Sequence, residues 1–192
     1  MRGRWRGGTV VCIASGPSLT ADDVERVRRW RQEARAPEER GVIVANTTYQ
    51  IAPWADALFA MDWAWWNKHI QQVLQEFEGA RFTVARVPDR WGVKQLAKFP
   101  TYGNSGAACI SLAMSGDAAR VVLLGYDCQW TGGKAHWHGD HPRGLGNAPR
   151  PHEWVKRFSE LASDFAGAEI LNSSRETALD MFRRCDLERA LA

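Results

Sequence analysis

The chain has 192 residues, of which 45% are hydrophobic and 24% charged, and its formal net charge is +3. This length and composition predict one globular domain with a hydrophobic core and exclude a disordered chain. The small charge permits anionic substrates but does not demand nucleic acid. No apolar run approaches the roughly 20 residues of a membrane span, and the apolar stretch after the basic segment 1–8 is too short for a signal peptide.

Four cysteines are scattered along the chain without a Cys-x-x-Cys pair: Cys12, Cys109, Cys128 and Cys185. This pattern is typical of reduced, mostly buried thiols. We therefore expect a cytoplasmic protein, located in the host cytoplasm if a phage encodes it. We also expect residues 1–192 to form a single domain with a basic, mobile N-terminus at 1–8.

The first predicted strand covers residues 10–14, where five apolar residues follow one another as in a fully buried strand. The turn Ser15-Gly16-Pro17-Ser18 comes next, and neither a strand nor a helix continues through it. A helix is predicted from Thr20 to about residue 36, because Thr20 is a good N-cap and two aspartates follow in the first turn. A strand, a small-residue turn and a helix N-terminus together favour an anion site, with a nucleotide phosphate as the usual ligand. A plain β–α turn without a ligand is the alternative.

Strands and helices alternate along the rest of the chain. Strands are predicted at residues 41–45, 56–61, 81–87, 118–125 and 168–171. Helices are predicted at residues 62–77, 107–114, 153–165 and 177–190. Segment 126–152 is a polar loop rich in Gly, His and Pro, and a loop of this length is usually functional. Because the strands are continuously apolar, the fold class is α/β, a single domain whose mostly parallel sheet carries helices on both faces.

Polar residues follow several of the predicted strands. In a parallel sheet the carboxyl ends of the strands meet at one edge, where ligands of open α/β folds bind. The residues at this common position include Ser15, Gly16, Pro17, Ser18, Asn46, Thr47, Asp62, Tyr126, Asp127 and Asn172. Their shared location, rather than any one motif, predicts a binding site.

The loop 126–152 contains the cluster His136, His138, Asp140 and His141. Two imidazoles and a carboxylate this close can bind Zn²⁺. The metallo-β-lactamase hydrolases that carry this signature need further ligands downstream, which the remaining chain does not supply. A metal held without that fold is one interpretation of the cluster. A second is acid–base catalysis by a His that Asp140 orients, since an unperturbed His has a pKa of about 6.5. A third is a solvated loop without a chemical role.

Several segments, in order along the chain, resemble a known group of families. The turn at residues 14–19 looks like the Gly-x-Gly-Pro-Ser-Leu turn of the family-42 sialyltransferases and of the related motility-associated-factor and archaeal pterin-diphosphokinase proteins. Residues 45–48 are similar to the Asn-containing turn of these proteins. Residues 101–108, followed by residues 121–129, are similar to their small-residue helix and to their strand that ends in Gly-x-Asp. Residues 170–174 are similar to their closing segment. The resemblance implies a modified Rossmann-like domain that holds a nucleotide or nucleotide-sugar, in a small, phage-type member of the group.

The resemblance also implies roles for particular residues. Ser15 and Gly16 would contact the phosphate or ribose, Asn46 the nucleotide or donor, and Ser105 with Gly106 the base. The full predicted nucleotide-binding set is Ser15, Gly16, Pro17, Ser18, Asn46, Thr47, Asn104, Ser105, Gly106 and Asn172. The sialyltransferases use a His in the loop after the Gly-x-Asp strand as their base, and the corresponding catalytic candidates are His136, His138, His141, Asp127 and Asp140. The turn departs from the family pattern at Ala14 and Ser15, and the phosphate-binding tyrosines have no matched counterpart.

These observations favour a transferase that uses an activated nucleotide donor of the CMP or UDP type. The reaction would be glycosyltransferase-like, with a loop His as base and no required divalent metal. The acceptor would be a glycan or, as a minor variant, modified DNA. One alternative is an ATP- and Mg²⁺-dependent, diphosphokinase-like transferase with Asp62, Asp127 and Asp140 as metal ligands. Another is a non-catalytic accessory protein that binds a nucleotide or nucleic acid.

Overall fold

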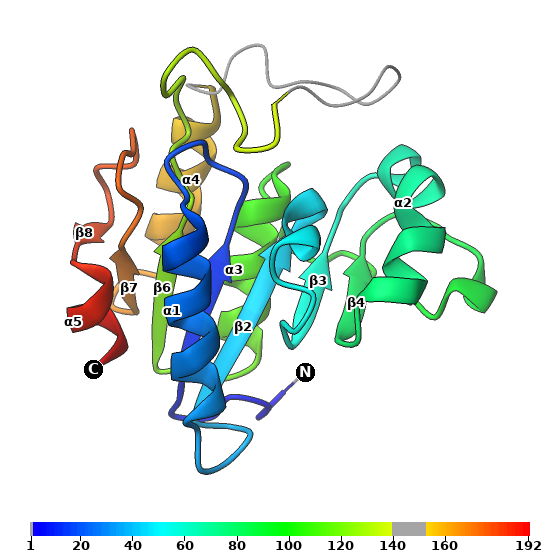
Figure 1. Ribbon diagram of the computed structural model, residues 1–192, viewed down its shortest axis with the longest axis horizontal. Coiled ribbons are helices and arrows are strands. Elements are labelled where there is room, and N and C mark those ends of the chain that lie inside the picture. The colour runs from blue at the N-terminus through cyan, green and yellow to red at the C-terminus, as the bar shows by residue number, and fades with distance from the viewer. Residues whose placement is uncertain (1, 140–152) are drawn as a thin grey trace.

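The computed structural model describes residues 2–139 and 153–192. Within them, eight strands form one sheet in the order β5-β4-β3-β2-β1-β6-β7-β8, and each neighbouring pair is parallel (Figure 1). The strands are β1 (Thr9–Ile13), β2 (Arg40–Ala45), β3 (Ala57–Phe59), β4 (Ala80–Thr83), β5 (Lys94–Gln95), β6 (Arg120–Leu124), β7 (Glu169–Asn172) and β8 (Arg183–Arg184). The helices are α1 (Ala21–Gln32), α2 (Trp63–Glu76), α3 (Ser105–Ser115), α4 (Glu153–Asp164) and α5 (Leu187–Leu191), with 3-10 turns η1 (Asn46–Gln50) and η2 (Asp89–Trp91). No helix in these described residues is long and apolar enough to cross a membrane.

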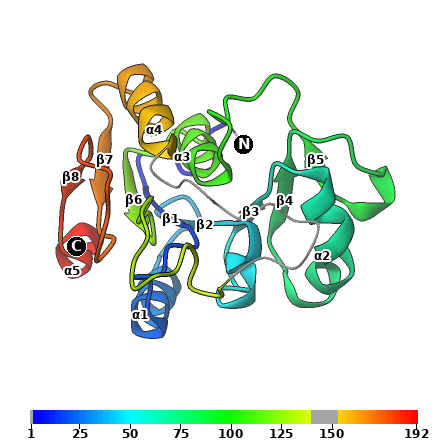
Figure 2. The same cartoon turned by 90° about the horizontal axis from the view of Figure 1, so that it is seen from above.

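Helices cover both faces of the sheet. One face packs against α1, α2 and α5, and the β1 residues Val11 and Ile13 are buried there. The other face packs against α3 and α4 and buries Val10 and Cys12. Figure 2 shows the two helical layers on opposite sides of the sheet. Because both faces are covered, these four β1 side chains are fully buried, which explains the unbroken apolar run in the sequence.

The predicted fold class is confirmed, since the chain forms a parallel α/β sheet with helices on both faces, as in a Rossmann-like domain. Helix α1 begins at the predicted position. Thr20 is its N-cap and forms a capping box with Asp23. The helix ends at Gln32, a few residues earlier than predicted.

The prediction of a helix over residues 177–190 is wrong. Residues 177–182 are irregular, the two-residue strand β8 follows, and α5 covers only Leu187–Leu191. Thr177 donates its hydroxyl hydrogen to the carbonyl oxygen of Tyr126 at 2.7 Å, and the side chain of Leu179 is fully buried in the α3–α4 layer. These tertiary contacts outweigh the local helix propensity of the segment.

The basic N-terminal segment, which we expected to be mobile, is held against the sheet by Trp5. The Trp5 side chain is fully buried, and its backbone N–H donates to the carbonyl oxygen of Gly116 at 2.9 Å. A Cβ atom on Gly41 would lie 2.2 Å from the indole, and one on Gly116 would lie 2.5 Å from it. The indole therefore fits between these two positions only because both are glycine.

Candidate functional site

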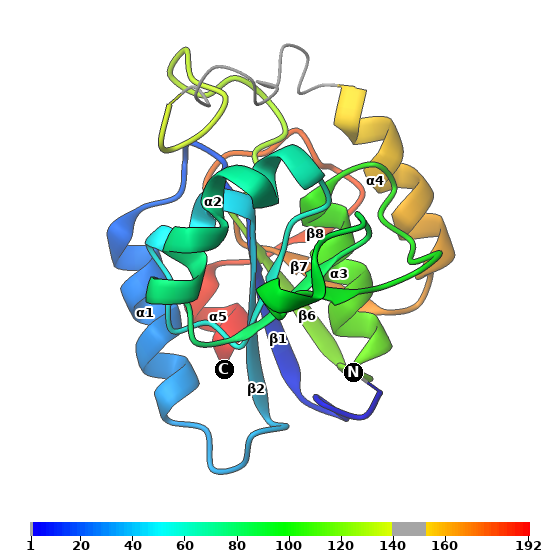
Figure 3. The same cartoon turned by 90° about the vertical axis from the view of Figure 1, so that its right-hand side faces the viewer.

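The carboxyl ends of the strands meet at one edge of the sheet. The order in which strands are added to the sheet reverses between β1 and β6. From β1 the chain passes through α1 to β2 on one side, whereas β6, β7 and β8 continue on the other side. Such a switch point opens a crevice in which α/β proteins bind ligands. The β1–α1 turn and the segment after β6 lie at this end of the molecule (Figures 1 and 3). We call residues 15–18, Asn46, the start of α3 and residues 125–139 the switch-point site.

The turn after β1 is a tight one. Leu19 donates its backbone N–H to the carbonyl oxygen of Gly16 at 3.2 Å. Pro17 therefore takes the second position of a β-turn, which its fixed φ angle favours. Gly16 also donates its N–H to the carbonyl oxygen of Gly125 at 2.7 Å, so the turn is bound directly to the end of β6.

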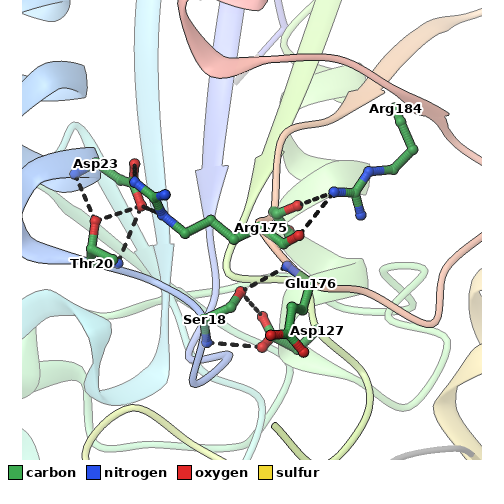
Figure 4. A network of polar contacts seen from close by, with 8 residues as sticks. Ser18, Thr20, Asp23, Asp127, Arg175, Glu176 and Arg184 are labelled. Atoms are coloured by element: carbon green, nitrogen blue, oxygen red, sulfur yellow. Dashed lines mark hydrogen bonds and ion pairs between the residues drawn. The ribbon is translucent and has the colours of Figure 1, made fainter.

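This turn encloses the carboxylate of Asp127. Ser18 donates its backbone N–H to Asp127 Oδ2 at 2.9 Å and its hydroxyl to Oδ1 at 2.8 Å (Figure 4). Thr131 donates its hydroxyl to Oδ2 at 3.0 Å. A Cβ atom on Gly16 would lie only 2.0 Å from Asp127 Oδ1 and 2.5 Å from the carbonyl oxygen of Gly125. Burial raises the pKa of Asp127, and the hydrogen bonds from Ser18 and Thr131 oppose this only in part. The anion that the turn accommodates is thus the protein's own carboxylate.

A second carboxylate, Asp23, fixes the start of α1. Its backbone N–H donates to Thr20 Oγ1 at 3.2 Å, and Arg175 donates two hydrogen bonds to the Asp23 carboxylate, both of 2.8 Å (Figure 4). Burial on its own would raise the pKa of Asp23, but the hydrogen bonds from Arg175 and Thr20 outweigh it and hold this pKa below its ordinary value. Arg184 donates in turn to the carbonyl oxygens of Ser174 and Arg175. The segment after β7 therefore helps to hold the β1–α1 turn in place.

The first histidine of the loop is anchored to the end of β1. His136 Nδ1 lies 2.9 Å from Ser15 Oγ, and Trp137 donates its backbone N–H to the carbonyl oxygen of Ser15 at 3.0 Å. The His136 side chain is only 7% exposed and stacks on His138, with ring centroids 5.1 Å apart and 9° between the ring planes. An imidazole is therefore held in a defined orientation at the switch point.

The structure describes two of the four predicted metal ligands, His136 and His138. Asp140 and His141 lie outside the described residues, and so do the catalytic roles expected of them. In residues 2–139 and 153–192, no group of three or more His, Cys, Asp or Glu side chains is arranged to hold a metal ion. Asp62 and Asp127, the other proposed Mg²⁺ ligands, follow β3 and β6. These strands are three strand spacings apart, roughly 14 Å. The described carboxylates thus do not converge on one ion.

Asn46 is the first residue of η1 and directly follows β2, the strand next to β1. Its backbone adopts a left-handed conformation with φ of 50°, which Asn tolerates better than most residues. Its side-chain Oδ1 is buried and has no hydrogen-bond partner among the described residues. The neighbouring Thr47 has a structural contact, because its Oγ1 accepts a hydrogen bond from Trp65 Nε1 at 3.3 Å. Asn46 Oδ1 is thus a buried acceptor that a ligand could satisfy.

The start of α3 is built from three of the predicted residues. Asn104 is the N-cap, and its Oδ1 accepts from the Gly106 N–H at 2.8 Å. Ser105 Oγ accepts from the Met61 N–H at 3.2 Å, which joins α3 to the end of β3. The carbonyl oxygen of Gly106 accepts from the Tyr126 hydroxyl at 3.0 Å. The Ser105 hydroxyl hydrogen therefore remains available for donation. The contacts of Asn104 and Gly106 stabilise the start of α3 and its packing on Tyr126.

Asn172 is fully buried at the end of β7, where its amide donates to Thr177 Oγ1 and accepts from the Ser174 N–H. Thr131 binds the Asp127 carboxylate and Arg175 binds the Asp23 carboxylate, and reasoning from the sequence did not select either residue. Arg175 directly follows the polar residues 172–174, which was the one available signal; nothing distinguished Thr131 within its loop.

The switch-point site thus combines the anchored imidazole of His136, the hydroxyl of Ser105 and the amide oxygen of Asn46, which has no partner in the part of the chain that the structure describes. Asp127 and Asp23 brace the turn on its other side. Comparisons with models of known families, with curated proteins and with solved structures found no match for this chain.

Proposed function

We propose that the protein is a transferase that binds an activated nucleotide donor at the switch-point site and uses His136 as its base. The observation that carries this proposal is the contact of 2.9 Å between Ser15 Oγ and His136 Nδ1. A general base must be held within reach of the proton it removes. The contact fixes an imidazole at the edge where α/β folds bind nucleotides.

The charge of the Asp127 carboxylate determines where we expect the donor phosphate to bind. The β1–α1 turn already holds the Asp127 carboxylate, and a second anion against it would be repelled. We therefore expect the phosphate on the side of β2 and α3. There it meets the hydroxyls of Ser15 and Ser105 and the N-terminus of α3, whose macrodipole favours an anion. Asn46 Oδ1, as an acceptor, suits an N–H or O–H donor of the base or sugar.

The orientation of His136 defines its part in the reaction. In the tautomer whose Nδ1–H donates to Ser15 Oγ, Nε2 carries the lone pair that would take a proton, and the proposed role of His136 as base requires this tautomer. As the acceptor hydroxyl attacks the donor, this proton passes to Nε2. The bond between the transferred group and the donor phosphate breaks, and the phosphate leaves with the electron pair. Ser15 is thus a positioning residue for His136 as well as a contact of the donor.

The ATP- and Mg²⁺-dependent alternative has less support, because the described carboxylates Asp62 and Asp127 follow strands roughly 14 Å apart. The non-catalytic alternative shares the nucleotide site. It differs in one expectation, which is that the unaltered protein, with His136 in place, would turn over no nucleotide donor.

The test is a thermal-shift panel of CMP, CDP, UMP, UDP, GDP, ADP and ATP, each with and without Mg²⁺ or Zn²⁺. A ligand at a hundred times its Kd adds about 2.7 kcal/mol of stability. We expect a cytidine or uridine nucleotide to stabilise the protein without metal. Ser15→Ala should weaken this ligand about fivefold or more, because one hydrogen bond is lost. Ser159→Ala, an exposed site on α4, is the matched control and should bind normally.

Other outcomes of the panel are equally informative. A response to ATP only with Mg²⁺ would replace the proposal with the diphosphokinase-like reaction. Silence throughout, or stabilisation that Ser15→Ala leaves unchanged, would refute the proposed donor site.

A further inference from the structure

A groove of about 770 Å³ lies beside the switch-point site, on the face of the sheet that α1 and α2 cover. Its walls are the first half of α1, the chain after η1 and the end of α2. Two indoles, those of Trp54 and Trp137, line it together with the charged residues Glu25, Arg28, Glu76 and Glu78. Its volume falls within the roughly 300–1,000 Å³ of typical small-molecule sites.

The groove shares a wall with the proposed catalytic site. Trp137 directly follows His136, and its backbone N–H is bonded to the carbonyl oxygen of Ser15. Leu19 and Thr20, which continue the β1–α1 turn, also line the groove. A molecule in the groove would therefore contact the residue that follows His136 in the chain and the end of the β1–α1 turn.

The charges of the groove favour a cation. Glu25 lies 3.8 Å from Arg28, so these two charges largely offset each other. Glu76 accepts two hydrogen bonds from the neutral Gln72, and Glu78 has no ion-pair partner among the described residues. Glu76 is the last residue of α2 and Glu78 follows two residues later, at the end of the helix where the macrodipole adds partial negative charge. One end of the groove is therefore negative, in a chain whose net charge is positive.

We propose that this groove binds the acceptor substrate and that the acceptor is a small organic cation, an alkylammonium compound with an apolar body and the hydroxyl group that attacks the donor. Indole faces attract such cations electrostatically, and the carboxylates of Glu76 and Glu78 complement the ammonium charge. The apolar body packs on Leu19 and Ile51. The role as acceptor rests on the proposed transferase function, whereas the binding of a cation rests on the groove alone.

The test uses three probes of one shape and different charge: benzylammonium, benzyl alcohol and benzoate. Their dissociation constants are measured by ligand-observed NMR on the full chain without nucleotide. We expect benzylammonium to bind about fivefold tighter than benzyl alcohol, and benzoate to bind most weakly. Glu76→Gln with Glu78→Gln should abolish this preference, while Glu38→Gln with Glu160→Gln, at exposed sites away from the groove, should keep it. Trp137→Ala should weaken all three probes.

Equal binding of the three probes, or an unchanged preference in the Glu76→Gln, Glu78→Gln protein, would overturn the proposal. Because no nucleotide is present, this failure is distinct from that of the donor site. Stabilisation by a nucleotide that depends on Ser15, without a preference for cations, would refute the groove and leave the transferase proposal standing. The reverse pattern would keep the cation site and refute the donor site.

Discussion

Trp5→Ala is expected to lower the free energy of unfolding by about 3–5 kcal/mol. The indole is fully buried, and the slot around it is formed partly by the backbone of Gly41 and Gly116. Backbone walls cannot move inward to fill the space, so most of the cavity would remain. Chemical denaturation followed by circular dichroism measures the loss.

Trp63→Ala is the matched control, because the Trp63 side chain is 52% exposed. Its cost should stay within about 0.5 kcal/mol. Equal effects of the two substitutions would mean that the N-terminal segment does not dock on the sheet in solution, as our expectation of a mobile segment 1–8 had it.

Gly16→Ala is expected to cost about 2–4 kcal/mol and to disturb the whole switch-point site. The new methyl group would lie 2.0 Å from Asp127 Oδ1 and 2.5 Å from the carbonyl oxygen of Gly125. The carboxylate could rotate away only by giving up its bonds to Ser18 and Thr131, and the Gly125 carbonyl belongs to the backbone. Thermal and chemical denaturation measure the stability, and the nucleotide panel measures the loss of donor binding.

Gly167→Ala is the control that distinguishes the steric clash at Gly16 from the general effect of replacing a glycine. Gly167 has a φ of +90° and no atom within 4 Å of the added methyl, so its cost is backbone strain alone, about 1–2 kcal/mol. If Gly16→Ala cost no more than Gly167→Ala and bound the nucleotide normally, Asp127 would not be held against the turn as described.

The central strands could be predicted from the sequence because helices cover both of their faces. Runs such as residues 10–13 and 121–124 are apolar throughout for this reason. The edge strands β5 and β8 have two residues each and are exposed, so they carry no hydrophobic pattern. The C-terminal segment has a helical sequence pattern, but the burial of Leu179 and the pairing of β8 with β7 decide its structure. Such contacts are not encoded locally.

The sequence located the edge of the sheet at which the polar residues gather, but not their partners. The turn at residues 15–18 has the composition of a phosphate-binding turn, yet it encloses Asp127, which is 109 residues away from Ser18. Ser15 and His136 are 121 residues apart and meet only because β1 pairs with β6. Proximity along the chain made a metal cluster one of three interpretations of the loop, whereas the structure joins its first histidine to the end of β1.

The response of the histidine resonances to bound nucleotide tests the central claim most directly. Spectra of the ring nitrogens of ¹⁵N-histidine are recorded with and without a saturating cytidine or uridine nucleotide, and His136→Gln assigns the key signal. The account predicts shifts at His136 and its stacking partner His138. It predicts no shift at His69, which is 9% exposed and stacked on Trp65 within α2. An unchanged His136 signal in the presence of a nucleotide that stabilises the protein would contradict the account.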